Sequence, residues 1–228
     1  CKKIVNIFGI FIYNSLSNAE NKALELIVLC NEIGLGSTSI CAALLHDVVE
    51  DTDYTVEDIE NIFGPKIAQI VDGLTKISGG IFGDRASAQA ENFKKLLLTM
   101  SNDIRVILIK IADRLHNMRT LGSMLPNKQF KIAGETLYIY APLANRLGLY
   151  KIKTELENLS FRYEHPEEYR EIEEKLAATA VERDKVFKEF TAPIRAQMDK
   201  MGLKYRILAR VKSIYSIWNL SLIHIYEP

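Results

Sequence analysis

Helical periodicity runs through almost all of the 228 residues, and it constrains the fold of this chain more than any other feature. Apolar residues recur at three- and four-residue spacing, and glycine or proline interrupts the pattern where helices end. The hydrophobic fraction of 48% is enough for a packed core. Residues 205–211 read instead as a strand. Helices are predicted over residues 22–33, about 38–50, a short stretch after Thr55, 66–77, 86–100, 104–121, 128–163 with interruptions near Pro142 and Gly148, and 167–200.

Charge and cysteine content exclude several classes of protein. Lys+Arg and Asp+Glu both number 29, which does not favour a nucleic-acid binder, so no direct DNA binding is expected. The apolar segment 4–13 is too short to span a bilayer and has no clear cleavage site after it, so no membrane association is expected either. Cys1, Cys30 and Cys41 form no CxxC pair and are interpreted as reduced thiols. A cytoplasmic location is predicted.

The strongest chemical signal is the segment His46-Asp47-Val48-Val49-Glu50-Asp51-Thr52. On a helix, its imidazole and three carboxylates fall within an arc of roughly 140°. Such a face, directly after an apolar stretch, would be costly to bury without compensation, and a divalent cation is the natural compensation. Imidazole together with carboxylate suits Mn, Fe or Zn better than Ca. The alternative is a helix end with solvated acids.

A second polar stripe lies in residues 110–120. Asp113, His116, Asn117 and Thr120 follow helical spacing, and their neighbours are apolar, which predicts a buried helix. A lone buried aspartate is more often a hydrogen-bonded structural residue than a ligand. Beside a separate His-Asp helix, however, Asp113 is predicted to bind the metal, while Asn117 and Thr120 could hold a substrate.

Five segments, in this order and at this spacing, resemble the N-terminal half of the long RelA/SpoT homologues. Each is weak alone, but together they extend over about residues 22–219 and make the resemblance specific. It implies an all-α HD-domain hydrolase bundle followed by the truncated start of an α/β synthetase domain. The segments are residues 42–52, 70–76, 110–120, 140–148 and 211–219.

The resemblance also implies an activity and a set of site residues. Family members remove pyrophosphate from the 3′ position of guanosine tetra- and pentaphosphate in the stringent response, and two histidines and two aspartates hold one Mn²⁺. Three of these four metal positions are matched by His46, Asp47 and Asp113. The acidic pair that serves the attacking water corresponds to Glu50 and Asp51, and positions in or near the substrate pocket correspond to Lys76, Arg114, Asn117 and Thr120. The ribosome is an expected partner through C-terminal regions of longer members.

Two departures from the family lie near the N-terminus. The family's upstream His-Pro, which supplies the first metal ligand, falls at Lys22-Ala23, and the loop that cradles the guanine is replaced by residues 16–20. A protonated lysine cannot ligate a metal and would repel it. A fault in sequence assembly and a natural lesion both remain open as explanations.

The expected organisation has five parts. Residues 1–21 form an atypical, artefact-like N-terminus, 22–165 the hydrolase domain, and 166–200 a helical connector. Residues 201–219 begin the synthetase domain, and 220–228 resemble an adapter-derived tail. Four residues resemble the start of the family's nucleotide-binding segment, namely Arg210, Lys212, Ser213 and Tyr215.

Three functions compete. The first is the guanosine 3′-diphosphate pyrophosphohydrolase, impaired in this chain by the loss at Lys22. The second is a degenerate HD domain that regulates an attached guanosine tetraphosphate synthetase. The third, an HD phosphohydrolase for other nucleotides, is disfavoured by the family-like segment 211–219.

Overall fold

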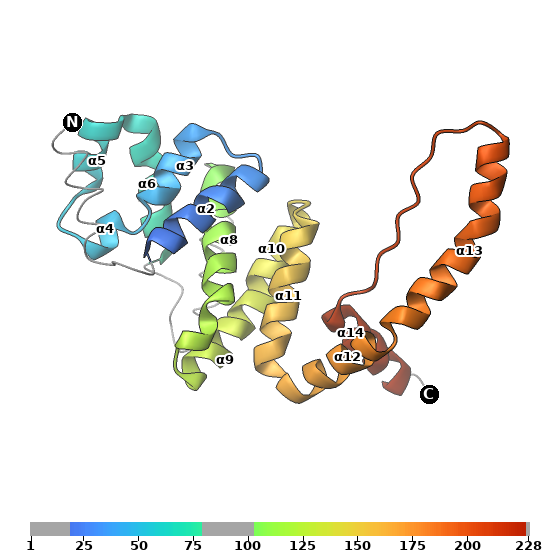
Figure 1. The fold of residues 1–228 in the computed structure, drawn as a ribbon. Coiled ribbons are helices and arrows are strands. Elements are labelled where there is room, and N and C mark those ends of the chain that lie inside the picture. Colours follow the sequence, from blue (N-terminus) through green and yellow to red (C-terminus); the bar gives the residue numbers. More distant parts are fainter. Residues whose placement is uncertain (1–18, 79–102, 227–228) are drawn as a thin grey trace.

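A computed structural model describes residues 19–78 and 103–226, and Figure 1 shows their arrangement. The N-terminal layer packs α2 on α3 and α8, with α6 covering α3 and α8. Thr55 begins α5 with a capping box to Asp58, as its spacing predicts. The helices of this layer are α2 (Ala19–Glu32), α3 (Ser37–Leu44), α4 (Val48–Asp51), α5 (Val56–Phe63), α6 (Pro65–Ser78) and α8 (Ile104–Arg119).

Helix α8 lies in the middle of the bundle (Figure 1). Asp103 caps its N-terminus by accepting a hydrogen bond from the backbone N–H of Arg105. Helices α2 and α6 contact it from one layer and α11 from the other, so the apolar residues in its middle are enclosed, whereas Ile104 at its start is exposed. Ile107, Ile111 and Leu115 are among these core residues. A polar side chain on α8 is therefore held in a rigid, dry setting.

The second layer consists of α9 (Pro126–Glu135), α10 (Ala141–Arg146) and α11 (Tyr150–Glu164). The interruption expected near Pro142 takes the form of a π turn over Thr136–Tyr140, where the N–H of Ala141 donates to the carbonyl of Thr136. Proline has no N–H and cannot continue a regular ladder, which explains the irregularity. Gly148 then ends α10 with a φ of 75°, a conformation that favours glycine.

The C-terminal helices are α12 (Pro166–Ala178), α13 (Ala180–Lys200) and α14 (Ile214–Tyr226). Helix α14 packs on α11 and α12, where the rings of Phe161 and Trp218 lie 4.7 Å apart. Helix α13 projects away from the bundle, and residues 201–213 return from its far end to α14 (Figure 1).

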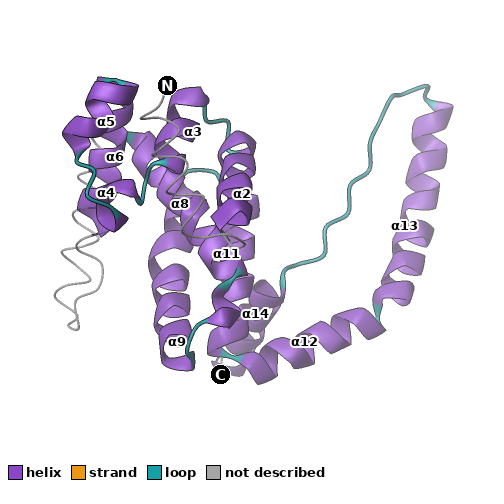
Figure 2. Ribbon diagram, turned by 60° about the vertical axis from the view of Figure 1, so that its left-hand side comes forward, coloured by secondary structure: helices purple, strands orange, loops and turns teal. Residues whose placement is uncertain are grey.

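Two sequence predictions are wrong in the described residues. Residues 205–211 form no strand, and Figure 2 shows helices and loops only in the described ranges. A strand needs a partner for its backbone groups, and this segment has none beside it. The helix expected over about 38–50 is interrupted by a turn at 45–47, and the helix expected over 86–100 lies outside the described residues.

None of the helices in residues 19–78 and 103–226 is both long and apolar enough to cross a membrane.

Candidate functional site

The turn at residues 45–47 places the first two site residues. The N–H of His46 bonds back to Ala43 and that of Val48 to Leu45, a spacing tighter than that of an α-helix. His46 is consequently buried with only 2% exposure, in contact with Asp47. The sequence prediction of one continuous helical face missed this turn.

Asp113 on α8 meets this pair from the opposite side. The Nε2 atom of His46 lies 2.8 Å from Oδ1 of Asp47 and 3.4 Å from Oδ1 of Asp113. Asn117, one turn along α8, donates a hydrogen bond of 3.2 Å to the second oxygen of Asp113. The structure thus brings together the three residues matched to metal positions, and it adds Asn117 as a support for Asp113.

The orientation of the His46 ring follows from one hydrogen bond. Nδ1 lies 2.7 Å from the carbonyl oxygen of Ala43, which can only accept, so Nδ1 carries a proton. Nε2 is then the atom that faces the two carboxylates. Burial opposes the charged form, but the carboxylates of Asp113 and Asp47 outweigh it and raise the pKa of His46 to about 9.

Lys22, in the first turn of α2, completes the cluster. Its Nζ lies 2.9 Å from Oδ2 of Asp47 and 3.4 Å from Oδ1 of Asp113. Burial alone would lower the pKa of Lys22, yet the two carboxylates raise it above its usual value. In return, although burial acts in the opposite direction, His46 and Lys22 lower the pKa of Asp47 to about 2 and that of Asp113 further still. The lysine expected to repel a cation is itself the cation held there.

The side chains of the cluster include donors of the kind that bind metal ions. Imidazole and carboxylate are donors that a metal could use, and Nε2 of His46 and Oδ1 of Asp113 are both buried, with ionic groups as their nearest polar neighbours: Asp47 at 2.8 Å from Nε2, and Lys22 and His46 at 3.4 Å from Oδ1. Nevertheless, no group of three or more His, Cys, Asp or Glu side chains in the described part of the chain is arranged to hold a metal ion. Lys22 occupies the position of the family's first metal ligand, and its ammonium lies against the carboxylates of both Asp47 and Asp113. In this arrangement the residues do not fit the metal.

Two predicted acids lie apart from this cluster. Glu50 and Asp51 are exposed at the end of the short helix α4. The turn at 45–47 interrupts the helical register that would have put them on the face of His46. The role of Glu50 and Asp51 toward an attacking water therefore stays a prediction from the resemblance.

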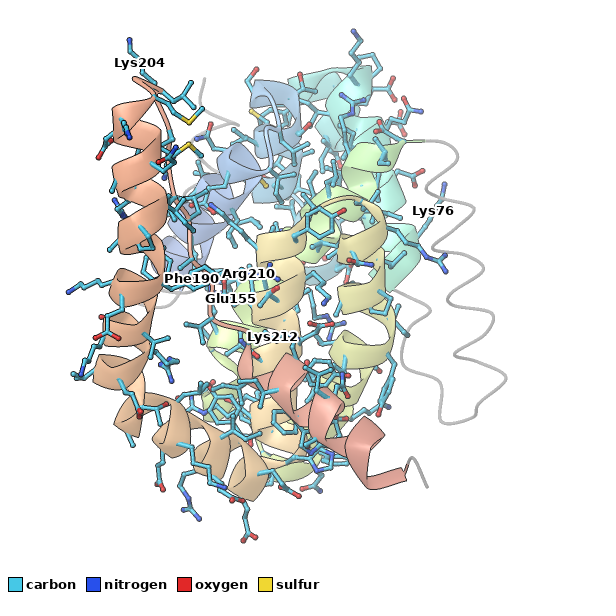
Figure 3. All side chains as sticks on the ribbon, turned by 90° about the vertical axis from the view of Figure 1, so that its right-hand side faces the viewer. Lys76, Glu155, Phe190, Lys204, Arg210 and Lys212 are labelled. Carbon is cyan, nitrogen blue, oxygen red and sulfur yellow. The ribbon has the colours of Figure 1, made fainter. Side chains whose placement is uncertain are left out.

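The remaining predicted residues have local partners. Lys76 projects from the surface, where it pairs with Asp72 at 2.5 Å (Figure 3). Thr120 donates to the carbonyl of His116 at the end of α8. Arg114 stacks over the ring of Tyr140 at 4.3 Å and pairs with the buried Glu135 at 3.6 Å. Burial raises the pKa of Glu135, and Arg114 partly offsets that effect.

Sequence reasoning missed a polar network beside the cluster. Nδ1 of His116 lies 2.7 Å from Glu25, and Arg119 bonds both Glu25 and Glu155. These residues come from α2, α8 and α11, so the network ties together three helices. His116 was visible in the polar stripe of residues 110–120, but its partner lies 91 residues away and had no local signal.

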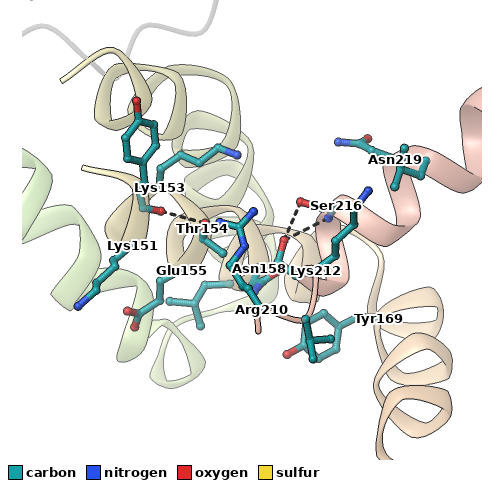
Figure 4. A pocket seen from close by; sticks show the side chains of 15 residues that line it. Lys151, Lys153, Thr154, Glu155, Asn158, Tyr169, Arg210, Lys212, Ser216 and Asn219 are labelled. Carbon is teal, nitrogen blue, oxygen red and sulfur yellow. Dashed lines mark hydrogen bonds between the residues drawn. The ribbon is translucent and has the colours of Figure 1, made fainter. Parts of the chain in front are cut away.

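A larger hollow lies away from this cluster. A pocket of about 1040 Å³ opens between α11 and residues 210–220, lined in part by Lys151, Lys153, Arg210 and Lys212 (Figure 4). Arg210 and Lys212 belong to the segment that resembles a nucleotide-binding sequence. The pocket does not include His46, Asp47 or Asp113, so it is separate from the cluster described above.

The helical bundle and its buried His-Asp turn agree with a comparison to known families. A family model described as HD domain matches residues 15–150. This chain belongs to the HD-domain family. The match covers both the turn at His46 and the aspartate on α8.

Curated relatives place the HD domain among the RelA/SpoT homologues. The bifunctional (p)ppGpp synthase/hydrolase SpoT of Escherichia coli K12 is 47% identical over 187 residues, which are 82% of this chain and 27% of that protein. The guanosine-3′,5′-bis(diphosphate) 3′-pyrophosphohydrolase of Vibrio cholerae is 48% identical over 82% of this chain and 27% of its own. The GTP pyrophosphokinase of Myxococcus xanthus is 48% identical over 86% and 26%. The chain therefore spans about a quarter of the length of these relatives.

Proposed function

We propose that this HD domain belongs to an enzyme that removes the 3′ pyrophosphate of guanosine tetra- and pentaphosphate. The observation that carries the proposal is the convergence of His46, Asp47 and Asp113 from two separate parts of a fold whose relatives are named for that reaction. Burying two carboxylates and an imidazole is costly and is typical of a functional site. A guanine nucleotide substrate also supports a cytoplasmic location.

The reaction needs an activated water and positive charge beside the phosphates. The family resemblance assigns the activation to Mn²⁺, which we propose as the cofactor of the family's reaction, although the present arrangement does not fit it. The carboxylates of Asp47 and Asp113 are ionised, but Lys22 engages both. Glu50 and Asp51, the acids expected to serve the water, are exposed. Hydrolysis by this chain is therefore expected to be weak.

The test is release of pyrophosphate from guanosine tetraphosphate in the presence of MnCl₂. We would compare the unmodified chain, Lys22→His/Ala23→Pro, the same variant carrying Asp113→Ala, and Lys185→His as a distant lysine control on the exposed face of α13. We expect slow release by the unmodified chain and the control, and release that is faster and depends on Asp113 in the double variant. Losses around a metal commonly cost about 10–100-fold, so a gain of at least about 10-fold is expected.

Two outcomes would contradict the proposal in different ways. Full activity of the unmodified chain, abolished by Asp113→Ala alone, would show that Lys22 does not impair the site. Hydrolysis of a different nucleotide by the double variant, with Mn²⁺ bound and guanosine tetraphosphate left intact, would contradict the assignment as a hydrolase of this nucleotide.

A second candidate is a degenerate HD domain that regulates an attached synthetase. The ion pairs of Lys22 favour it, because they close the cluster that hydrolysis would need open. Calorimetric titration of the unmodified chain with guanosine tetraphosphate separates the two. Binding with the nucleotide recovered intact would favour regulation, whereas conversion to product would favour the enzyme.

A further inference from the structure

We propose that the ammonium group of Lys22 takes the place of a metal ion in this HD domain, and that neutralising Lys22 creates a divalent-cation site at His46, Asp47 and Asp113. The inference concerns cation binding in the absence of any nucleotide. It therefore stands or fails separately from the proposed hydrolase activity.

The position of the ammonium is the first argument. Nζ of Lys22 contacts one oxygen of Asp47 and one of Asp113, at 2.9 and 3.4 Å. It thus lies against the two carboxylates that also converge on the imidazole of His46. Metal ions bind carboxylate oxygens at about 2.0–2.2 Å, so a metal and this ammonium would compete for the same oxygens.

The packing of α2 is the second argument. Helix α2 contacts both α3, which leads into the turn carrying His46 and Asp47, and α8, which carries Asp113. The side chain of Lys22, which α2 carries, is 26% exposed, so its aliphatic part is largely enclosed while its ammonium reaches the cluster. The fold itself therefore delivers the cation, and the ion pairs do not depend on a mobile surface side chain.

The small free space beside Lys22 is the third argument. The cavity lined by Lys22 and His46 measures about 10 Å³, which is room for no more than about one water molecule. Neither Asp47 nor Asp113 lines it, so this cavity offers a cation no second place against the two carboxylates.

The chemistry of the remaining donors identifies what would replace the ammonium. One imidazole nitrogen and carboxylate oxygens suit Mn²⁺, Fe²⁺ or Zn²⁺ better than Ca²⁺. The ring of His46 is already fixed by its bond to Ala43, which leaves Nε2 facing the two carboxylates. A neutral side chain at position 22 would remove one of the two cationic partners of Asp47 and Asp113, the other being His46, and a divalent cation would supply the charge that is lost.

The experiment measures Mn²⁺ binding by the loss of the paramagnetic resonance signal of free Mn²⁺. The proteins are the unmodified chain, Lys22→Met, Lys22→Met/Asp113→Asn and Lys153→Met. Lys153 is a matched control, because its side chain is 27% exposed and paired with Glu157 at 2.8 Å. We expect Lys22→Met to bind one Mn²⁺ at least about 10-fold more tightly than the unmodified chain. Asp113→Asn should remove that site, and Lys153→Met should match the unmodified chain.

Thermal unfolding provides a second readout. Because a ligand that binds the folded state stabilises it, Mn²⁺ should raise the Tm of Lys22→Met and leave that of the unmodified chain unchanged. If Lys22→Met is unfolded without metal, recovery of its helical circular dichroism on adding Mn²⁺ supports the proposal, and no recovery contradicts it. Equal Mn²⁺ affinity in the unmodified chain and in Lys22→Met, abolished in both by Asp113→Asn, would also overturn it.

Discussion

At the residue scale, one side chain, that of Lys22, decides whether the cluster of His46, Asp47 and Asp113 is open to a metal ion. His46, Asp47 and Asp113 could be predicted, because acids and an imidazole after an apolar run point to a buried polar site. The shared partner of Asp47 and Asp113 could not be predicted, because Lys22 lies 25 residues before Asp47 and further still before Asp113, and the contact depends on how α2 packs. The sequence predicted that Lys22 would repel a metal. In the structure, Lys22 instead forms ion pairs with Asp47 and Asp113.

Arg114 also has a partner that the sequence did not predict, Glu135, and this pair leads to a prediction about stability. Its guanidinium pairs with Glu135, which is 5% exposed, so removing the arginine takes the more effective of two positive charges, the other being Lys131, away from a buried carboxylate. Arg114→Met should lower the free energy of unfolding by about 3 kcal/mol, as measured by urea denaturation. The exposed pair of Lys76 and Asp72 offers a control, since Lys76→Met should cost less than about 1 kcal/mol.

The Arg114 prediction includes an internal check. If loss of the counter-charge is the cause, Arg114→Met/Glu135→Met should be more stable than Arg114→Met alone, because no buried charge remains. Equal destabilisation in both variants would instead assign the effect to the lost stacking on Tyr140, which lies 4.3 Å from the guanidinium.

At the scale of the elements, the helices were predictable and their breaks were less so. The stretches from 104 and from 151 follow helical spacing and form α8 and α11 nearly as expected. The turn at 45–47 had no glycine or proline to mark it, and Glu50 and Asp51, which follow it, are exposed. Pro142 did mark its break, although the form of that break, a π turn, depends on how the surrounding helices pack.

The network of Glu25, His116 and Arg119 ties α2 to α8 and makes a pH-dependent prediction. Burial would raise the pKa of Glu25, but hydrogen bonds from Arg119 and His116 outweigh it and hold that pKa below the usual 4.5. The stability that this carboxylate contributes is therefore present above about pH 4.5 and lost as the pH falls below it. Urea denaturation midpoints between pH 6 and pH 3 should fall less steeply in Glu25→Gln than in the unmodified chain.

Glu171 is the matched control for that series. Its pKa is also lowered, by a hydrogen bond from Lys175, but the carboxylate is fully exposed on α12. Glu171→Gln should leave the acid limb of the stability curve almost unchanged. If Glu171→Gln flattens that limb as much as Glu25→Gln, the effect is general surface charge and does not arise from the three-helix network.

At the scale of the whole molecule, the bundle up to α11 is well packed, while α13 and residues 201–213 are not. The segment 205–211 was predicted as a strand from its residue types, but strand formation depends on a neighbour that the sequence of the segment cannot report. Leu208 is 73% exposed and lies in backbone without a ladder. The start of an α/β synthetase domain therefore remains an expectation from the resemblance.

Hydrogen exchange should separate these two regions. Amides of residues 205–211 have no ladder to protect them and are expected to exchange rapidly, whereas those in the buried middle of α8 should exchange only on global unfolding. Exchange followed by mass spectrometry on peptides from both regions provides the comparison. Protection of residues 205–211 comparable to that of α8 would show that the segment is packed in a way that this structure does not contain.

The central claim is that Lys22 closes a buried His-Asp-Asp cluster in which a metal would otherwise be expected. Crystals of the unmodified chain soaked in MnCl₂ test it most directly, through anomalous scattering recorded near the manganese absorption edge. The account predicts no anomalous peak between Asp47 and Asp113, with the ammonium of Lys22 in contact with both carboxylates. A strong peak within about 2.2 Å of His46, Asp47 and Asp113, with Lys22 displaced toward solvent, would contradict it.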